Sequence, residues 1–153
     1  MNRKTLAAVG LLAVALIATP ALATLPNGVT GVVHARAVID EKVKVREAAG
    51  TELVAQQITI QAGGDTGWHT HPGAALAIVK SGTLTVTSVR PGKHGAPRCE
   101  TKTVPAGQAF VDPGHGNVHI ARNLGPAPAE VWVTYTGVPV GGAFRIDADD
   151  PGC

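Results

Sequence analysis

From residue 51 onward, the chain alternates short apolar or β-branched runs with breaks that contain Gly and Pro. Within several runs apolar and polar residues alternate with a period of two, which is typical of a strand with one buried face. The runs that we predict as strands are 52–61, 74–80, 82–89, 100–104, 108–111, 118–123, 130–136 and 143–146. Many short strands at even spacing predict an all-β antiparallel sandwich or barrel.

The segment before these strands is ambiguous. Alternation around Val43-Lys44-Val45 favours a strand, whereas residues 35–41 are also compatible with a helix. We therefore assign residues 24–50 to a lead-in that contains the first strand or strands and residues 51–146 to the barrel. Residues 147–153 form an acidic tail that ends in a cysteine.

The first 23 residues have the layout of a secretory signal peptide. A basic start precedes an apolar stretch over residues 6–18, and small residues follow at Ala21 and Ala23. An uncleaved membrane anchor would need roughly 20 apolar residues, and this stretch is shorter. We expect cleavage after Ala23 and secretion to the extracellular space, the cell envelope or the periplasm.

The net charge changes when the expected signal peptide is left out. The full sequence has 13 basic and 11 acidic residues, but Arg3 and Lys4 belong to the expected signal, so the remaining domain is formally neutral. A neutral domain without a Lys/Arg cluster has no electrostatic footprint for nucleic acid and no basic stripe for a membrane surface. A hydrophobic content of 44% is sufficient for one packed core.

The sequence contains two cysteines, Cys99 and Cys153. In an exported protein the oxidising compartment favours a disulfide between them. A two-cysteine metal site is the alternative, but the spacing lacks the CxxC pattern. We expect a disulfide whose role is stability.

Histidines carry the candidate chemistry. His69 and His71 are two residues apart, so on an extended strand both side chains point to the same face. A third imidazole, His119, lies in the strand-like run 118–123. Neutral imidazoles favour a divalent transition metal, here Fe, Zn, Ni, Cu or Mn, over Mg or Ca.

The spacing around His69 and His71 resembles the first motif of the cupin superfamily. That motif is Gly, five residues, His-x-His, three or four residues, Glu, six residues, Gly. Here Gly63 and Gly82 occupy the glycine positions, and the glutamate position is Ala75.

The second cupin motif is Gly, five residues, Pro-x-Gly, two residues, His, three residues, Asn. Its positions are matched by Gly107, Pro113, Gly116, His119 and Asn123. The step from Pro to Gly holds two residues instead of one, so this turn is one residue longer. The resemblance covers roughly residues 52–137. The whole chain also resembles small exported cupins of unassigned function.

The resemblance implies a double-stranded β-helix, or jelly-roll barrel, with a metal bound by His69, His71 and His119. It also implies pairing into homodimers. Ala75 cannot coordinate a metal, although on the strand it would share a face with the first two histidines. Ala77 on that face is also small, which leaves room in a pocket for a ligand or for water.

Three arrangements of the site are compatible with the sequence. In the first, the three histidines hold a metal whose remaining coordination positions are open, as catalysis requires. Alternatively, His115 or Asp112 replaces the missing carboxylate ligand, or the site is degenerate and the histidines only line a pocket.

An enzyme with this site would be a metal-dependent oxygenase, an isomerase or a lyase that acts on a small molecule. The rival function is a non-catalytic extracellular module that binds a metal or a small molecule. The sequence shows no Ser/His/Asp or Cys/His nucleophile arrangement, and it shows no convincing general base beside the histidines.

Structural roles are expected for the remaining candidates. Asp65 is assigned to a turn and Asn123 to a hydrogen bond at the end of a strand. Trp132, in an apolar run, is assigned to the core, and His34 and His94 are expected on the surface.

Overall fold

A computed structural model of the chain describes residues 27–92 and 97–153. Contacts divide the chain into two units, residues 1–32 and residues 33–153. Of the first unit only residues 27–32 are described, and these form no helix or strand. The expected signal peptide, residues 1–23, and His94 lie outside the described residues. The account below concerns the second unit.

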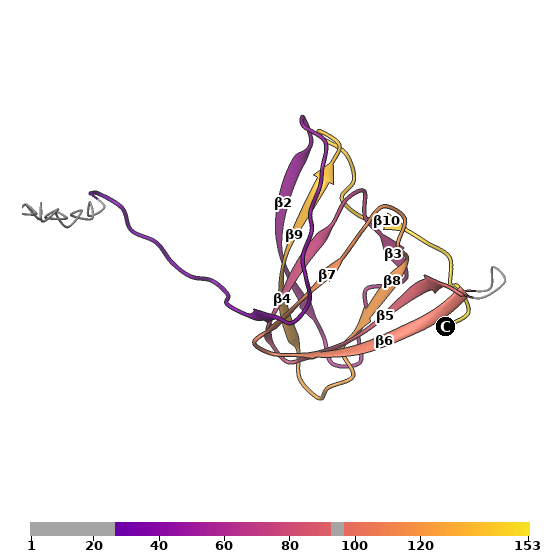
Figure 1. The fold of residues 1–153 in the computed structure, drawn as a ribbon. Coiled ribbons are helices and arrows are strands. Elements are labelled where there is room, and N and C mark those ends of the chain that lie inside the picture. Colours follow the sequence, from indigo (N-terminus) through magenta and orange to yellow (C-terminus); the bar gives the residue numbers. More distant parts are fainter. Residues whose placement is uncertain (1–26, 93–96) are drawn as a thin grey trace, which may run out of the picture. The chain divides into compact units, whose positions relative to one another are not determined.

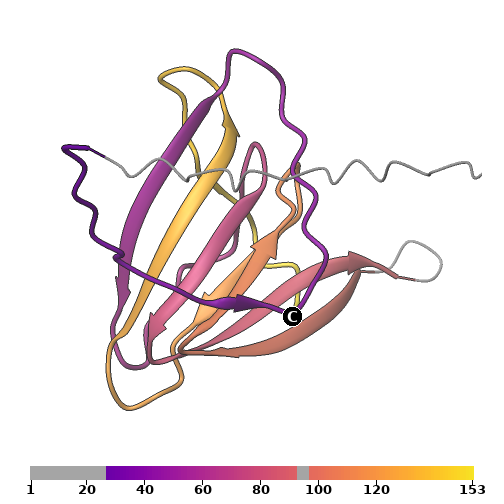
Figure 2. The same cartoon turned by 60° about the vertical axis from the view of Figure 1, so that its left-hand side comes forward.

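The second unit consists of two five-stranded sheets (Figure 1, Figure 2). In spatial order, sheet A contains β1 (Val38–Ile39), β7 (Gln108–Asp112), β4 (Ala75–Ser81), β9 (Ala129–Val138) and β2 (Glu52–Ile60). Sheet B contains β10 (Ile146–Asp147), β3 (His69–Thr70), β8 (His119–Arg122), β5 (Thr83–Pro91) and β6 (Pro97–Pro105). The strand pairs are antiparallel except for β1 with β7. The predicted all-β cupin-type fold is confirmed.

Alternating residues build the core between the sheets. In β4, for example, Ala75, Ala77 and Val79 are buried while the residues between them are only partly buried. Their buried neighbours come from both sheets and include Leu84, Val86, Phe110, Ala121, Val131 and Val133. Burial of this apolar surface, at roughly 25 cal/mol per Å², supplies the main stabilising term.

The observed strands differ from the predicted runs at a few places. The run 143–146 contributes only Ile146 to a strand, and the two-residue strand β3 was not predicted as a separate element. Residues 35–41 contain no helix; Val38 and Ile39 form β1, in register with Gln108 and Ala109 of β7. Within the described part of the chain, no helix is long and apolar enough to span a membrane.

The expected core position of Trp132 is wrong. Its side chain is half-buried on the outer face of sheet A, where its ring stacks on exposed His34 with centroids 5.0 Å apart. The run around it is apolar at successive positions, so the pattern alone does not show which face of β9 is inside. Asn123 is fully buried and donates to the carbonyls of Ile60 and Ala127, which confirms its structural role.

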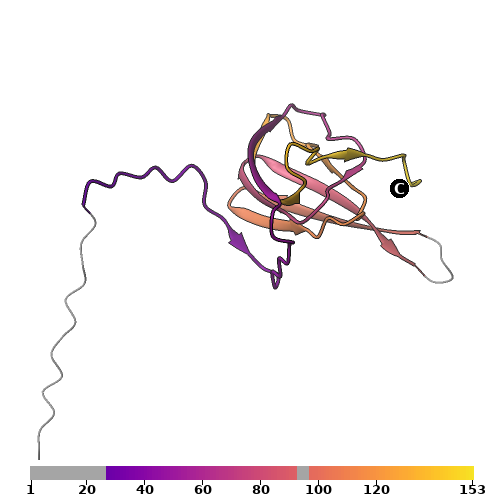
Figure 3. The ribbon, with the colours of Figure 1, turned by 90° about the horizontal axis from the view of Figure 1, so that it is seen from above.

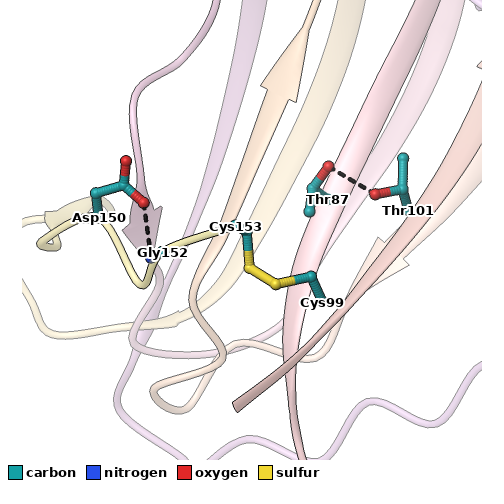
Figure 4. Close-up of a disulfide and its surroundings, with 6 residues drawn as sticks. All are labelled: Thr87, Cys99, Thr101, Asp150, Gly152 and Cys153. Carbon is teal, nitrogen blue, oxygen red and sulfur yellow. Dashed lines mark hydrogen bonds between the residues drawn. A yellow bond between two sulfur atoms is a disulfide. The ribbon is translucent and has the colours of Figure 1, made fainter.

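The last fifteen residues, 139–153, form a segment that we call the C-terminal arm. Its strand β10 pairs with β3, so Asp147 lies opposite His69. Figure 4 shows its end, where Cys153 is bonded to Cys99 on β6 with a Cα–Cα distance of 5.9 Å. Both ends of the arm are therefore attached to the barrel. In Figure 3 the arm runs along one side of the barrel to this end.

Candidate metal centre

Three histidines meet between the two sheets. His69 on β3 and His119 on β8 are directly paired across the strands, with ring centroids 4.3 Å apart. The ring of His71 lies 4.9 Å from that of His69 and 5.2 Å from that of His119. One nitrogen of each ring lies within 4.8 Å of the others, and all three residues are at most 5% exposed.

The Nδ1 atoms of two of these rings are held by backbone carbonyls. Nδ1 of His69 lies 2.8 Å from the oxygen of Gly67, and Nδ1 of His71 lies 2.7 Å from the oxygen of Phe144. A carbonyl only accepts, so in each case Nδ1 carries the proton and donates it. The lone pair is then on Nε2, which is the form a histidine takes when it binds a metal through Nε2.

His119 has a different partner. Its Nδ1 lies 3.4 Å from Oδ1 of Asp112 and 3.5 Å from the carbonyl oxygen of Asn117. The Asp112 carboxylate is itself fixed, because it accepts hydrogen bonds from the backbone N–H of Gly114 and the side-chain amide of Asn117. Asp112 therefore orients His119 from behind instead of joining the histidine nitrogens as a ligand.

Burial keeps the histidines neutral. Desolvation lowers the pKa of His69 to about 3, and the neighbouring imidazoles and the charge of Arg145 act in the same direction. Desolvation likewise lowers the pKa of His71 and of His119, although the Asp112 carboxylate opposes this for both. Three neutral imidazoles near one point can bind a cation without first losing protons at neutral pH.

A cavity of about 40 Å³ adjoins the histidines. Its wall includes Ala75 and Ala77 from β4 and Tyr135 from β9. A single water needs about 10–15 Å³ on this measure, so an ion and one or two small groups fit. Ala75 provides no ligand atom, and its methyl group leaves this space open.

The expected strand placement of Ala75 needs correction. His69 and Ala75 belong to different strands in different sheets, because Pro72 and Gly73 form a bend between them. Ala75 still faces the histidines, but from the opposite sheet. Its direct partner on β7 is Asp112.

The structure does not bring His115 to the centre. The side chain of His115 is 60% exposed, and its Nε2 lies 3.6 Å from Oε2 of Glu47. His115 lies in the lengthened turn with a left-handed φ of 52°. The preceding Gly114 packs so closely on Gly73 that a Cβ at position 114 would lie 1.8 Å from the Gly73 carbonyl oxygen. The His115 backbone N–H donates to the His71 carbonyl, and its side chain points away.

A second, open cavity of about 640 Å³ shares His69 and Tyr135 with the inner one. Sequence reasoning missed the residues that the arm adds to its wall, Phe144 and Arg145. Tyr135, also missed, donates its hydroxyl to Oε1 of Gln56 at 3.1 Å, and its ring lies 4.8 Å from that of His71. Only the histidine spacing was visible as a local pattern; the approach of residues 73 positions apart, such as His71 and Phe144, was not.

The donor set fits a divalent transition metal. Three buried, neutral imidazoles, each with Nδ1 against an acceptor, are the nitrogen ligands that Zn, Fe, Ni and Cu accept. Among the described residues, these histidines form the one group with this geometry.

Comparison with known proteins agrees with the fold. A family model described as Cupin domain matches residues 56–135. No protein in the curated set matches the sequence. Among solved structures, an oxalate oxidase aligns with a TM-score of 0.54 and 22% identity, over 63% of this chain and 46% of that one.

Two further structures are similar. An oxalate oxidase in complex with the substrate analogue glycolate has a TM-score of 0.48 and 25% identity, over 54% of this chain and 40% of that one. An uncharacterized conserved protein with a double-stranded β-helix domain, from Klebsiella pneumoniae, has a TM-score of 0.45 and 22% identity, over 69% and 77% of the two chains. The present chain thus spans less than half the length of these oxalate oxidase chains.

Proposed function

This chain belongs to the cupin domain family, and from that premise we propose that it is an exported, metal-dependent oxygenase-type enzyme that acts on a small molecule. The metal would be held by His69, His71 and His119. The observation that carries the proposal is the common orientation of the three rings, whose Nδ1 atoms face fixed acceptors and whose Nε2 atoms are left for one cation.

A divalent transition metal at this place would supply a Lewis acid and, if redox-active, a centre for dioxygen chemistry. The chain's own residues do the rest. Asp112 orients His119 through Nδ1, and the carbonyls of Gly67 and Phe144 orient the other two rings. Apolar residues of both sheets, among them Leu84 and Val133, line much of the inner cavity.

Ala75 makes three protein ligands the complete set, because it replaces a carboxylate with a methyl group that faces the cavity. A site with three protein ligands keeps positions open for a substrate, as catalytic metal sites do. The Tyr135 hydroxyl lies on a residue of the same wall, and it donates to Oε1 of Gln56. Burial raises its pKa, so at neutral pH the hydroxyl keeps its proton.

A non-catalytic binding module is the second candidate, and one observation favours it. The carboxylate in the wall of the inner cavity, Asp112, already accepts hydrogen bonds from Gly114 and Asn117. It is therefore engaged in structure and poorly placed to take a proton from a substrate.

Export is part of the proposal. The signal-like residues 1–23 motivate it, and the disulfide between Cys99 and Cys153 is of the kind that oxidising compartments maintain. N-terminal sequencing of the protein recovered from its native compartment tests this. We expect a mature chain that begins at residue 24; an intact residue 1 on a cytosolic protein contradicts export.

The enzyme and the module are separated by turnover. We would load the protein with Fe, Mn, Cu, Ni or Zn and measure dioxygen uptake and product formation with catechols, thiols, diketones and hydroxy acids. Turnover that is lost in His71→Ala and kept in His34→Ala supports the enzyme, since exposed His34 lies on the outer face. Tight binding of a ligand with no turnover under any metal supports the module.

A further inference from the structure

The C-terminal arm places the positively charged side chain of Arg145 at the opening of the metal centre. Just before Arg145, the carbonyl of Phe144 accepts from His71. Just after it, strand β10 pairs with β3, and the N–H of Ala148 donates to the carbonyl of Trp68 at 3.0 Å. Arg145 is thus held between two anchor points, beside the residues that carry the candidate ligands.

Arg145 lines the open cavity of about 640 Å³, together with His69 and Tyr135. A cavity of this size is within the range of small-molecule sites. Because His69 and Tyr135 also line the inner cavity, a ligand in the open cavity borders the metal centre directly.

The charge of this opening is set by few residues. Among the residues that line it, Arg145 is the one lysine or arginine and Asp65 the one acid. The Asp65 carboxylate is turned to its own loop, where Oδ1 accepts from the N–H of Gly67 at 2.7 Å.

The Arg145 guanidinium has N–H donors that are not used by its contacts with Asp147. Its Nε and Nη2 both contact one oxygen of Asp147, at 2.9 and 2.8 Å. The Asp147 side chain is 83% exposed, and ion pairs of this kind are weak. Arginine has five N–H donors, so the edge formed by its two Nη atoms remains for a second, bidentate acceptor.

The rest of the cavity wall favours a short, partly apolar molecule. Ile58, Ile60 and Phe144 provide apolar surface, and Gln56 and Tyr135 provide a polar pair. The Gln56 amide accepts from Tyr135 through Oε1, so its NH₂ group remains a donor for an oxygen of a ligand.

We propose that this cavity binds a small organic carboxylate, whose carboxylate pairs with Arg145 and whose adjoining carbon faces the three histidines. Arg145 is then the residue that selects acids over neutral molecules. This inference rests on the proposed function, because it gives the substrate class of that same site.

The test is binding, measured by calorimetry on metal-free and metal-loaded protein in low-chloride buffer. The probes are pyruvate, lactate and benzoate, with lactamide and benzamide as uncharged counterparts. We expect dissociation constants on the order of 1 mM or below for at least one acid, and at least about tenfold weaker binding of its amide. Arg145→Gln should weaken binding of the acid by about tenfold or more, and Arg145→Lys by less, because a bidentate site distinguishes the two cations.

The matched control is Arg98→Gln, which removes an exposed arginine of the edge strand β6 and should leave binding unchanged. Thermal unfolding of each variant shows whether it is folded; Arg145 is partly exposed, so we expect no loss. Equal affinities for acid and amide, or an acid affinity that Arg145→Gln leaves unchanged, overturn the inference.

Measuring the metal content of each sample distinguishes a failure of this inference from a failure of the proposed function. Protein that holds metal but binds acids independently of Arg145 contradicts the inference and leaves the metal centre standing. Protein that holds no metal contradicts the proposed function, and Arg145-dependent binding of an acid by that protein still supports the anion site.

Discussion

Ala75 on β4 and Asp112 on β7 are directly paired across sheet A, and both face the three histidines. The carboxylate that the first cupin motif would place at position 75 is missing, and the carboxylate on the neighbouring strand contacts Nδ1 of His119. The centre thus contains a carboxylate on β7 that contacts the Nδ1 side of His119.

Asp112→Asn tests that role. The substitution keeps the size and one acceptor oxygen but removes the charge beside His119. Loss of such a supporting group typically costs 10–100-fold in metal affinity, and we expect an effect of about that size, measured by competition with a chelator. Exposed Asp149 in the acidic tail provides the control Asp149→Asn, which should behave as the wild type. Identical metal affinities for the two variants would show that Asp112 does not support the centre.

The disulfide should influence the metal centre through the C-terminal arm. Cys153→Ser frees the end of the segment whose Phe144 carbonyl holds His71. Closing a loop of 54 residues contributes on the order of 4 kcal/mol in the chain-entropy model. We expect a lower melting temperature and a faster loss of metal to a chelator.

Reduction of the wild type with dithiothreitol should reproduce the effect of Cys153→Ser, and the variant itself should not respond to the reductant. A variant that melts early but releases metal at the wild-type rate would limit the disulfide to a stabilising role.

The part of the site that could be predicted from the sequence was the set of histidines, because their spacing along the chain is a local pattern. A His-x-His step and a third histidine near a strand start indicate a metal centre, and Asp112 was a named candidate. Its actual role depends on the pairing of β7 with β4, which the sequence does not display. Phe144 and Arg145 come from an arm that folds back on β3, and long-range contacts of this kind leave no periodic pattern.

The fold followed the same division. Strand positions could be predicted from the alternation of apolar and polar residues and from Gly and Pro. The side of a strand that faces the core could not be predicted where successive residues are apolar, as around Trp132. The extra residue in the second motif could be read from the sequence, but the direction of the His115 side chain in that turn could not. In the structure His115 has a left-handed φ of 52°, and its side chain is 60% exposed.

Stability of the metal-free protein should depend on pH through the buried histidines. The unfolded chain takes up protons on them as the pH falls below 6.5, whereas folded His69 does so only near a pKa of about 3. The unfolded state therefore binds more protons between these values, and the free energy of unfolding decreases as the pH falls. Each such histidine adds a slope of about 1.4 kcal/mol per pH unit.

Urea unfolding between pH 5.5 and 6.5 checks this, because carboxyl groups with an ordinary pKa of 4.5 stay mostly ionised over that range. His69→Gln should reduce the slope, and His34→Gln should not, since His34 is exposed. A slope that is the same in all three proteins would mean that His69 is not held neutral.

Asn123 should be important for folding and not for metal binding. It is fully buried, its amide donates to the carbonyls of Ile60 and Ala127, and its Oδ1 accepts from the N–H of Gly125. Asn123→Ala leaves these groups without partners, at about 1–3 kcal/mol for each one that stays buried. We expect a loss of several kcal/mol in urea unfolding, whereas Leu124→Ala at the exposed neighbour should cost little. A loss below about 1 kcal/mol would contradict this role.

Metal stoichiometry tests the central claim most directly. Wild-type protein, and the variants His69→Ala, His71→Ala and His119→Ala, would be incubated with Mn, Fe or Zn, desalted, and examined by elemental analysis, with His34→Ala and His115→Ala as controls. We predict about one equivalent of metal in the wild type and both controls, and less than about a tenth in each of the three variants. Less than about a tenth of an equivalent in the wild type, or an unchanged content in the three variants, would contradict a metal centre built from these histidines.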